Sequence, residues 1–387
     1  MKKKVAILGS TGSIGKNTLE IINSNRKNFN IVLLSANSNY VTIRHQIKKY
    51  KPKYFVVNSY KVYQKILKDK NIKITKVINN FSDIPKNIKF HISISAIVGI
   101  AGLEPTIQFV KKSEKILMAN KESIICGWHI IKSISEKYKT DIIPIDSEHF
   151  SINQLTKNYK DNDIKKIFIT ASGGPFLRKP LKSFNNIKPQ DASKHPNWKM
   201  GKKISIDSSN LMNKVLELIE AFRLFKFNPK KYEIVIHPQS LVHAIVFFKN
   251  GQSKLLYHET NMKIPIANAI YDNNVNIENF INTKKHYLKN LSFEKVDKKR
   301  FPIVTLLNSK IYLNSGPIIL NACNEILVDR FIKKEIPYRA IYQCLKRIFK
   351  DRDFKKYAVK KRPSIDDIYK IDKWARYKAI QIIKTKS

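Results

Sequence analysis

The chain has 387 residues, of which 43% are hydrophobic, so it is long enough for two or three domains with buried cores. Its longest apolar runs, such as residues 241–248, are far shorter than the roughly 20 residues of a membrane-spanning helix, so we expect no membrane partner. The three cysteines lie far apart and form no CxxC pair, which argues against a disulfide framework. These features predict a cytoplasmic protein.

The formal net charge of +43 comes from 73 Lys and Arg residues against 30 Asp and Glu residues. A nucleic-acid-binding protein usually concentrates its basic residues on one face, arm or helix. Here lysine is spread from end to end with abundant Ile and Asn, a pattern typical of A- and T-rich coding sequence. We therefore expect no specific nucleic-acid partner. The charge should instead attract anionic ligands, phosphorylated substrates among them.

The first part of the chain, to about residue 150, alternates short apolar runs with amphipathic stretches, as βαβ units do. The predicted strands are residues 5–8, 31–35, 54–57, 92–94, 116–119 and 142–145. The predicted helices include residues 17–24, 41–50 and 61–68. This order predicts an α/β fold that begins with a Rossmann-like, doubly wound parallel sheet, whose ligands bind at the carboxyl ends of the strands.

The pattern changes after about residue 167, where segments 167–170, 233–236 and 244–248 predict strands of a second sheet. Residues 172–201 are rich in Gly and Pro with little periodicity, and a loop of this length is typical of a lid or a binding element. Residues 273–299 are polar and predict a linker. Beyond Phe301 the apolar spacing becomes helical.

Three glycines, Gly9, Gly12 and Gly15, follow the first predicted strand and precede a helix that we expect to begin near Asn17. Such a turn lets the backbone and the free N–H groups of a helix start approach the pyrophosphate of a dinucleotide. A tight strand-to-helix turn without a ligand is the alternative, although the position at the head of a βαβ pattern favours the dinucleotide. Residues 35–39 contain no carboxylate to hold a ribose 2′-hydroxyl, which predicts NADPH over NADH.

Three carboxylates are candidates for a divalent metal site. Asp146 and Glu148 stand two apart after the last predicted strand of the first domain, and in extended backbone they would point to the same side. Glu217 follows Ser208, Asn213 and Lys214 on a segment that looks like a capped helix, whose start would hold a phosphate. Carboxylates suit Mg²⁺ or Mn²⁺. The alternatives are a helix N-cap at Asp146 and a solvated amphipathic helix around Glu217.

Other polar groups lie where a ligand would bind. Ser172 and the two glycines after it follow a predicted strand and suit phosphate contact, while His195 and Trp198 could close over a ligand. Asn120 and Glu122 lie at a strand end and could reach the nicotinamide ribose, with Lys121 reaching the substrate. Taken singly, a histidine or a tryptophan is more often structural.

Taken together and in order, these segments resemble the 1-deoxy-D-xylulose 5-phosphate reductoisomerases of non-mevalonate isoprenoid biosynthesis. The resemblance covers essentially the whole chain and rests on the motifs GSTGSIG, MANKES, PIDSEH, ASGGPF, HPNWKMGKKISIDSSNLMNK and VIHPQSLVHAIV. It implies an NADPH domain at 1–147, a catalytic, metal-binding and dimerisation domain of α+β type at 148–272 with a flap at about 172–202, a linker at 273–299 and a helical domain at 300–387. It also implies a homodimer formed through the central domain.

The resemblance carries functional roles onto individual positions. It implies that NADPH is held by Thr11, Gly12, Ser13, Ile14, Asn37, Ser38, Asn39, Asn120, Glu122 and Gly201. The divalent metal, Mg²⁺ or Mn²⁺ with Co²⁺ as a further candidate, falls to Asp146, Glu148 and Glu217. The phosphorylated sugar substrate falls to Lys121, Ser147, Glu148, Ser172, His195, Trp198, Ser208, Asn213, Lys214 and Glu217. The catalytic set is Lys121, Asp146, Glu148 and Glu217, with Lys121 and Glu148 as candidates for proton transfer.

The implied reaction is an NADPH-dependent rearrangement and reduction of 1-deoxy-D-xylulose 5-phosphate to 2-C-methyl-D-erythritol 4-phosphate. One departure from the family is Ser38, where many members have a basic residue, so 2′-phosphate recognition would depend on Ser35, Asn37 and backbone N–H groups. His237 matches a family motif but suits a structural role. Two rivals remain, a semialdehyde or acyl-phosphate dehydrogenase with Cys126 as nucleophile, and a basic nucleic-acid-binding protein.

Overall fold

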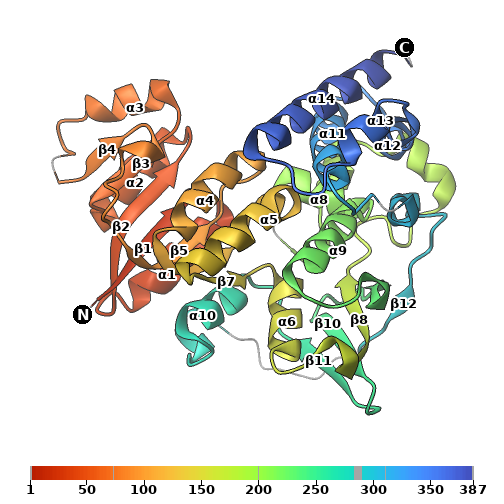
Figure 1. Ribbon diagram of the computed structural model, residues 1–387, viewed down its shortest axis with the longest axis horizontal. Coiled ribbons are helices and arrows are strands. Elements are labelled where there is room, and N and C mark those ends of the chain that lie inside the picture. The colour runs from red at the N-terminus through yellow and green to blue at the C-terminus, as the bar shows by residue number, and fades with distance from the viewer. Residues whose placement is uncertain (1, 73, 199, 283–289, 310, 386–387) are drawn as a thin grey trace. The chain divides into compact units, whose positions relative to one another are not determined.

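The computed structural model describes residues 2–72, 74–198, 200–282, 290–309 and 311–385 (Figure 1). Residues 283–289 of the expected linker lie outside the described part. The chain divides into two compact units, each made of several segments. Unit 1 comprises Met1–Ser123, His129–Phe150 and Asn261–Tyr287, and unit 2 comprises Ile124–Trp128, Ser151–Thr260 and Leu288–Ser387. Within the described ranges, no helix combines the length and hydropathy that a membrane crossing requires.

Unit 1 is built on a parallel sheet that has seven strands in the described part of the chain, in the order β4-β3-β2-β1-β5-β6-β7. The prediction of a doubly wound parallel sheet is confirmed. The strand order reverses between β1 and β5, which is where nucleotides bind in such folds. The strands are β1 (Lys3–Leu8), β2 (Phe29–Ala36), β3 (Tyr54–Val57), β4 (Lys76–Ile78), β5 (Phe90–Ser95), β6 (Ser113–Met118) and β7 (Asp141–Pro144). The short strand β4 was not predicted.

The helices of unit 1 include one that comes from far along the chain. The helix α10 packs against α1, and Lys263 Nζ of α10 lies 2.7 Å from Glu20 Oε2 of α1. The expected central domain ran to residue 272, whereas the structure groups residues 261–287 with unit 1. The helices are α1 (Ser13–Ser24), α2 (Tyr40–Tyr50), α3 (Tyr60–Leu67), α4 (Leu103–Val110), α5 (Lys121–Tyr138), α6 (Ser147–Thr156) and α10 (Lys263–Tyr271). Residues 124–128 of α5 and 151–156 of α6 are grouped with unit 2.

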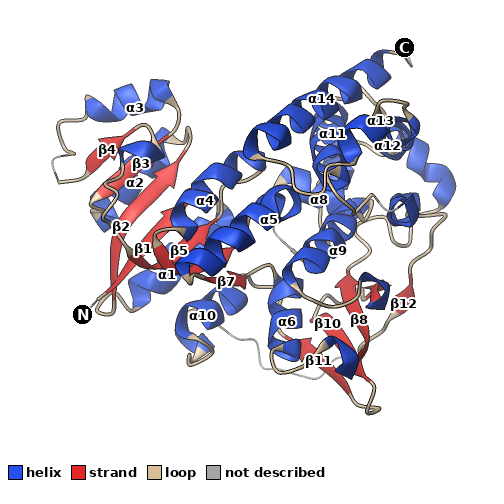
Figure 2. Cartoon of the chain, in the orientation of Figure 1, coloured by secondary structure: helices blue, strands red, loops and turns tan. Residues whose placement is uncertain are grey.

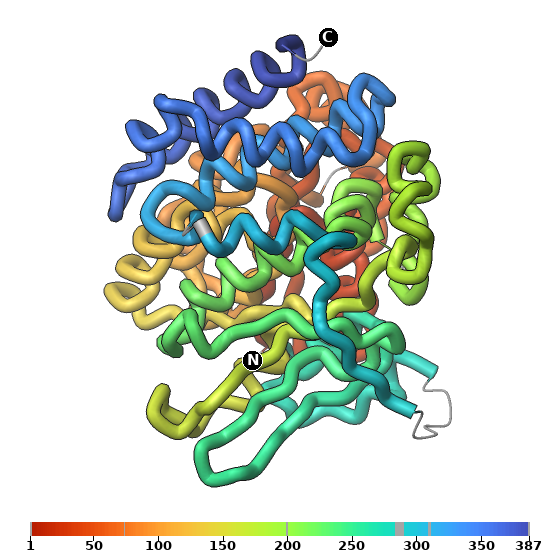
Figure 3. Tube along the Cα trace, turned by 90° about the vertical axis from the view of Figure 1, so that its right-hand side faces the viewer, coloured from red at the N-terminus to blue at the C-terminus, as the bar shows by residue number. Residues whose placement is uncertain are grey.

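Unit 2 contains a mixed sheet in the order β11-β10-β8-β9-β12. Strands β8 and β9 are parallel, while β10 is antiparallel to β8 and forms a hairpin with β11 that is seen in Figure 3. This mixed sheet agrees with the expected α+β class. The edge strands β11 and β12 were not predicted. The strands are β8 (Ile164–Ala171), β9 (Tyr232–Ile236), β10 (Val242–Phe248), β11 (Ser253–Tyr257) and β12 (Glu294–Lys295).

The chain after residue 300 is helical, as predicted, and Figure 2 shows it as a group of helices. Helix α11 packs against α14, α12 and α8. Apolar side chains at helical spacing, such as Ile341, Leu345 and Ile348 of α12, are buried. The helices of unit 2 are α7 (Pro189–Ala192), α8 (Lys202–Ser209), α9 (Met212–Leu224), α11 (Gly316–Ile332), α12 (Ala340–Lys350), α13 (Phe354–Ala358) and α14 (Ile365–Lys384), with 3₁₀ turns at Leu181–Asn186 and Pro302–Ser309.

One expected helix is divided in two. The segment 207–217 was expected to form a single capped helix starting near Ser208, but α8 ends at Ser209 and α9 begins at Met212. Between them Leu211 adopts a left-handed backbone, with φ +66°, and its side chain is buried. Ser208 therefore lies in the last turn of α8, and the prediction that it lies at a helix start is wrong.

Candidate active site

The glycine turn joins β1 to α1 by close backbone packing. A Cβ atom at Gly9, whose φ is +88°, would lie 2.5 Å from the carbonyl oxygen of Ala96, and one at Gly15 would lie 2.5 Å from that of Gly9. Helix α1 starts at Ser13, four residues earlier than expected, with Gly12 as an N-cap that has no side chain to bond the first amides. The first turn of α1 therefore presents N–H groups to an anionic ligand, which fits a pyrophosphate.

Sequence reasoning missed Gln46, a buried side chain of α2 that clamps the same turn. Its amide donates a hydrogen bond of 2.9 Å to the carbonyl of Ser10 and accepts one of 2.6 Å from the hydroxyl of Ser10. Gln46 is 3% exposed and Ser10 is fully buried. A polar residue on the buried side of an amphipathic helix was the signal that would have found it.

The segment after β2 divides into a buried and an exposed part. Ser35 is buried and its hydroxyl accepts a hydrogen bond of 3.1 Å from Gly9 N–H, which gives it a structural role in the turn, while its contact with a 2′-phosphate stays a prediction. Asn37, Ser38 and Asn39 are exposed. The Asn39 side chain caps α2 by accepting from Thr42 N–H at 3.1 Å.

Asn120 and Glu122 lie at the carboxyl end of β6, where α5 begins. The Asn120 amide donates to the carbonyls of Ile97 and Gly99, at 2.6 and 3.1 Å, and to a Glu122 oxygen at 2.9 Å. Its oxygen accepts from Ser123 N–H at 2.8 Å and so caps α5. The two side chains are buried and tie the ends of β5 and β6 together beside the switch point of the sheet.

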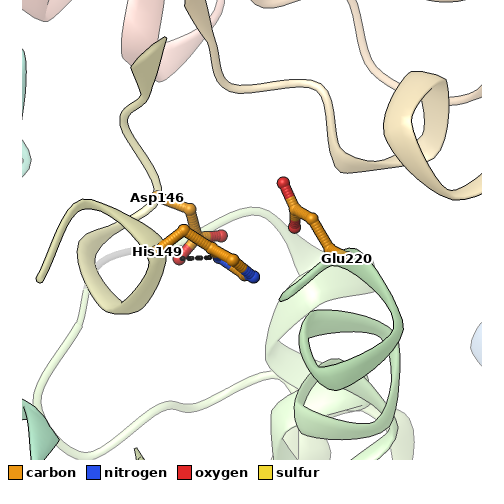
Figure 4. Close-up of side chains that lie close together, drawn as sticks. All are labelled: Asp146, His149 and Glu220. Carbon is orange, nitrogen blue, oxygen red and sulfur yellow. Dashed lines mark ion pairs between the residues drawn. The ribbon is translucent and has the colours of Figure 1, made fainter. Parts of the chain in front are cut away.

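The polar residues after β7 form a charged group in unit 1. Lys121 Nζ lies 3.2 Å from Asp146 Oδ2, and the Ser147 hydroxyl donates to Glu148 at 2.6 Å. Figure 4 shows the ion pair between Asp146 and the buried His149, with 3.9 Å between Oδ1 and Nδ1. Asp146 precedes α6 and Glu148 lies in its first turn, so the expectation of an extended backbone here is wrong.

Helix α9 of unit 2 carries a buried polar face. Lys214 Nζ lies 2.7 Å from Glu217 Oε2, and Asn213 donates to the other Glu217 oxygen. Each of the three is less than one tenth exposed, which excludes a solvated helix face. One turn further, Glu220 is also buried and belongs to the residues drawn in Figure 4. The spacing of three from Glu217 was a signal for Glu220 that sequence reasoning did not use.

The flap region of unit 2 is folded around His195. Its Nδ1 accepts from the N–H groups of Asn197 and Trp198, at 3.1 and 2.9 Å, so the proton of the neutral ring lies on Nε2 and is donated to the Ser172 hydroxyl at 2.9 Å. Burial, assisted by the charge of Lys214, lowers the pKa of His195 to about 4. The Trp198 ring packs edge-on against His243, with 6.0 Å between centroids. Gly201 is the N-cap of α8.

The dehydrogenase alternative with Cys126 as nucleophile is not supported, whereas the contacts of His237 agree with the structural role expected for it. Cys126 is 2% exposed within α5, where a nucleophile would not meet a substrate. The two ring nitrogens of His237 bind the carbonyl of Ser292, at 2.9 Å, and the N–H of Leu241, at 3.2 Å, as in a structural role.

The residues present do fit the implied ligands, because carboxylates are hard oxygen donors for a divalent cation and the start of α1 suits a pyrophosphate.

Comparison with known proteins extends over nearly the whole chain. The family model described as 1-deoxy-D-xylulose 5-phosphate reductoisomerase matches residues 5–127, and models of C-terminal domains of that enzyme match residues 142–225 and 258–378. The chain is 46% identical over 384 residues to the 1-deoxy-D-xylulose 5-phosphate reductoisomerase of Pelagibacter ubique (strain HTCC1062), covering 97% of this chain and 98% of the relative. It is 38% identical to that of Wolbachia pipientis wMel, covering 99% and 98%.

Solved structures agree in fold. A crystal structure of DOX-P reductoisomerase in complex with NADPH, fosmidomycin and magnesium has a TM-score of 0.90 and 32% identity, covering 99% of this chain and 98% of that chain. The Zymomonas mobilis reductoisomerase in complex with NADPH has a TM-score of 0.87 and 30% identity, covering 99% of each chain. Fold and site thus define an NADP-dependent oxidoreductase that also uses a divalent metal. The chain belongs to the 1-deoxy-D-xylulose 5-phosphate reductoisomerase family.

Proposed function

We propose that the chain converts 1-deoxy-D-xylulose 5-phosphate to 2-C-methyl-D-erythritol 4-phosphate, with NADPH and a divalent metal, in non-mevalonate isoprenoid biosynthesis. Family membership over nearly the full length supports the reaction. The structural observation that carries the proposal is the buried trio Asn213, Lys214 and Glu217 on α9. Burying a charged pair costs free energy, and such a cluster is typical of a functional site.

The proposed metal ligands are Asp146, Glu148 and Glu217, with Mg²⁺ or Mn²⁺ as the ion. When bound, the metal acts as a Lewis acid and template for the neighbouring carbonyl and hydroxyl oxygens of the substrate. In unit 1, Lys121 lies beside Asp146 at 3.2 Å, where its ammonium group holds the carboxylate side chain in place. Lys121 and Glu148 are the proposed groups that hold and move protons at the substrate oxygens.

The proposed phosphate site lies in unit 2. The donors are the hydroxyls of Ser172 and Ser208, the amide of Asn213 and the ammonium of Lys214, with His195 orienting Ser172 through their hydrogen bond of 2.9 Å. Trp198 is proposed to cover the substrate and exclude water when the flap closes. The remaining proposed substrate contact is Ser147.

NADPH, which supplies the hydride, is proposed to bind at the carboxyl edge of the unit 1 sheet. The first turn of α1 would hold the pyrophosphate, and the exposed Asn37 and Ser38 would face the 2′-phosphate. The proposed contacts are Thr11, Gly12, Ser13, Ile14, Asn37, Ser38, Asn39, Asn120, Glu122 and Gly201. The resemblance further supports a cytoplasmic homodimer formed through the central domain, which light scattering on the purified protein would test.

The deciding assay follows the absorbance of NADPH with 1-deoxy-D-xylulose 5-phosphate, with and without Mg²⁺. Oxidation of NADPH that depends on both the sugar phosphate and the metal is expected. The absence of oxidation with Mg²⁺, Mn²⁺ and Co²⁺ in turn would contradict the proposal.

Glu217→Gln tests the metal assignment. The change keeps the size of the side chain and removes the charge, so turnover should fall at least about a hundredfold while the Kd for NADPH stays within twofold. Glu233→Gln, at a half-exposed carboxylate of β9 paired with Lys166, is the matched control and should turn over normally. Metal-dependent turnover near the wild-type rate in Glu217→Gln would show that Glu217 is not a ligand.

A further inference from the structure

Ser208 lies in the last turn of α8, and the residues on either side of it are tied to the C-terminal helices of unit 2. The Asp207 carboxylate accepts a hydrogen bond of 2.8 Å from Asn324 Nδ2 of α11. The Ser209 hydroxyl and the hydroxyl of Tyr338, which lies between α11 and α12, are hydrogen bonded at 3.0 Å. Ser208 is thus flanked by two tertiary hydrogen bonds to one helical region.

The residues that make these contacts are buried. Asp207 is 2% exposed, Ser209 and Asn324 are fully buried, and Tyr338 is 6% exposed. The second oxygen of Asp207 accepts from Lys203 Nζ at 2.9 Å. Burial raises the pKa of the Tyr338 phenol, so its hydroxyl keeps its proton. Losing the Asn324 amide would leave one oxygen of the buried Asp207 without its hydrogen bond, and losing the Tyr338 hydroxyl would leave the Ser209 hydroxyl with only its bond of 2.7 Å to the Ile206 carbonyl.

The backbone of the segment after β8 also packs closely against the last turn of α8. A Cβ atom at Gly174, whose φ is +67°, would lie only 2.9 Å from the carbonyl oxygen of Ser208. Phe176, two residues further on, packs edge-on against the Tyr338 ring with 5.4 Å between centroids. The segment that follows β8, the end of α8 and the C-terminal helical region therefore meet around Ser208.

Helix geometry alone does not hold Ser208 in place. The helix ends at Ser209, and the left-handed backbone of Leu211 separates it from α9. The last four carbonyl groups of a helix have no hydrogen-bond partner within it, so side-chain anchors help to fix the position of its last turn. In α8 those anchors are the side chains next to Ser208.

We infer that Asn324 and Tyr338 are positioning residues that fix the last turn of α8, so that the Ser208 hydroxyl meets the substrate phosphate. The inference rests on the proposed function, which assigns Ser208 to the substrate. It gives the C-terminal helices a role in substrate binding. Because a donor must be held within a fraction of an ångström of its phosphate oxygen, loosening this turn weakens binding of the phosphorylated substrate. The proposed NADPH contacts in unit 1 do not depend on this turn, and the proposed contact in unit 2, Gly201, lies at the other end of α8.

The test uses two variants that remove one hydrogen bond each and keep the side-chain volume. Asn324→Leu removes the donor to Asp207, and Tyr338→Phe removes the hydroxyl that meets Ser209. Tyr342→Phe is the matched control, because its hydroxyl pairs with that of Thr305 at 3.3 Å in the same helical region. The KM and kcat with 1-deoxy-D-xylulose 5-phosphate, the Kd for NADPH and the Tm are measured for each variant.

We expect KM for the sugar phosphate to rise about tenfold in each variant, and to rise in the double variant no further than in Ser208→Ala, because both residues act through the same turn. The Kd for NADPH should stay within twofold, and Tyr342→Phe should change Tm without changing KM. In a Ser208→Ala background, Tyr338→Phe should raise KM no further, since it acts through Ser208. A lower Tm with an unchanged KM, or an equal KM rise in Tyr342→Phe, would overturn the inference.

A failure of the proposed function would be recognised separately. If the wild-type protein does not oxidise NADPH with the sugar phosphate, the proposed function fails, and binding of inorganic phosphate by calorimetry then tests the inference alone. Weaker phosphate binding in Tyr338→Phe and Asn324→Leu, but not in Tyr342→Phe, would support the role of the two residues. Equal binding in all of them would refute it.

Discussion

Buried polar residues set the geometry of the nucleotide turn in unit 1. The backbone of Ser10 is held by Gln46 from one side and by Ser35 from the other, with Ser10 N–H donating to the Ser35 carbonyl at 2.8 Å. These contacts place the Gly12 N-cap and the first turn of α1. A pyrophosphate site made of backbone N–H groups therefore depends on a side chain 36 residues away.

Replacing Gln46 should weaken the binding of NADPH and of NADH by the same factor. Gln46→Leu removes both hydrogen bonds to Ser10, so the turn loses its anchor while the 2′-phosphate contacts remain. We expect the Kd values for NADPH and NADH, measured by protein fluorescence, to rise by the same factor of about ten. Gln381→Leu, at an exposed residue of α14 that contacts Tyr377, is the control. Unchanged binding in Gln46→Leu would contradict this role.

The low pKa of His195 makes the stability of the flap region depend on pH. An unfolded histidine titrates near 6.5, while burial and the charge of Lys214 lower the pKa of His195 to about 4. Between these values only the unfolded state binds the proton, so the stability contributed by neutral His195 is complete above about pH 6.5 and falls as pH drops towards 4. An NMR titration of the histidine ring signals, with the His195 signal assigned by His195→Asn, should show that the His195 ring stays neutral at pH 5. A His195 midpoint near 6.5 would contradict the burial argument.

At the scale of elements, the interruption between α8 and α9 separates polar residues that the sequence pattern predicts on one helix. The face of α9 carries Asn213, Lys214 and Glu217, while Ser208 lies in the last turn of the preceding helix. A run of residues with helical spacing predicts one continuous helix. Only packing around the buried Leu211 determines where the backbone turns left-handed.

Two glycines with a left-handed backbone make it possible to distinguish the cost of backbone strain from the cost of a close contact. Gly174→Ala adds a Cβ atom 2.9 Å from the Ser208 carbonyl, whereas a Cβ at Gly251, with φ +85°, meets nothing within 4 Å. Gly251→Ala should therefore cost only the backbone strain, about 1–2 kcal/mol. Gly174→Ala should cost more and raise KM for the sugar phosphate. Urea unfolding and steady-state kinetics measure both effects, and equal behaviour of the two variants would refute the close contact.

At the scale of the whole molecule, the net charge of +43 places like charges over the entire surface. Self-repulsion of this kind destabilises a compact state and is screened over about 10 Å at 0.1 M salt. We expect Tm to rise as NaCl is added at low ionic strength, and any binding of random-sequence DNA to disappear over the same range. DNA binding that persists at high salt and depends on sequence would instead indicate a specific nucleic-acid partner.

Most strands of unit 1 were predicted from local patterns of apolar residues in the sequence. Parallel strands buried on both faces form continuous apolar runs, so β3 was predicted at its observed bounds and the other predicted strands of unit 1 within about three residues of theirs. The three-residue β4 and the edge strands β11 and β12 were not, because a short or half-exposed strand carries little apolar signal. The departures at Glu148 and Ser208 have one cause, since helix boundaries depend on capping and packing partners distant in sequence.

The sequence by itself determined the class of chemistry, because the glycine turn, the three carboxylates and the motifs around them are local groups of residues whose types fix what they can bind. Tertiary structure alone decided which polar residues are buried and what holds them. Gln46 reaches Ser10 across 36 residues, and Asn324 reaches Asp207 across 117. Such contacts form only when apolar cores bring distant segments together, and burial then makes each hydrogen bond necessary.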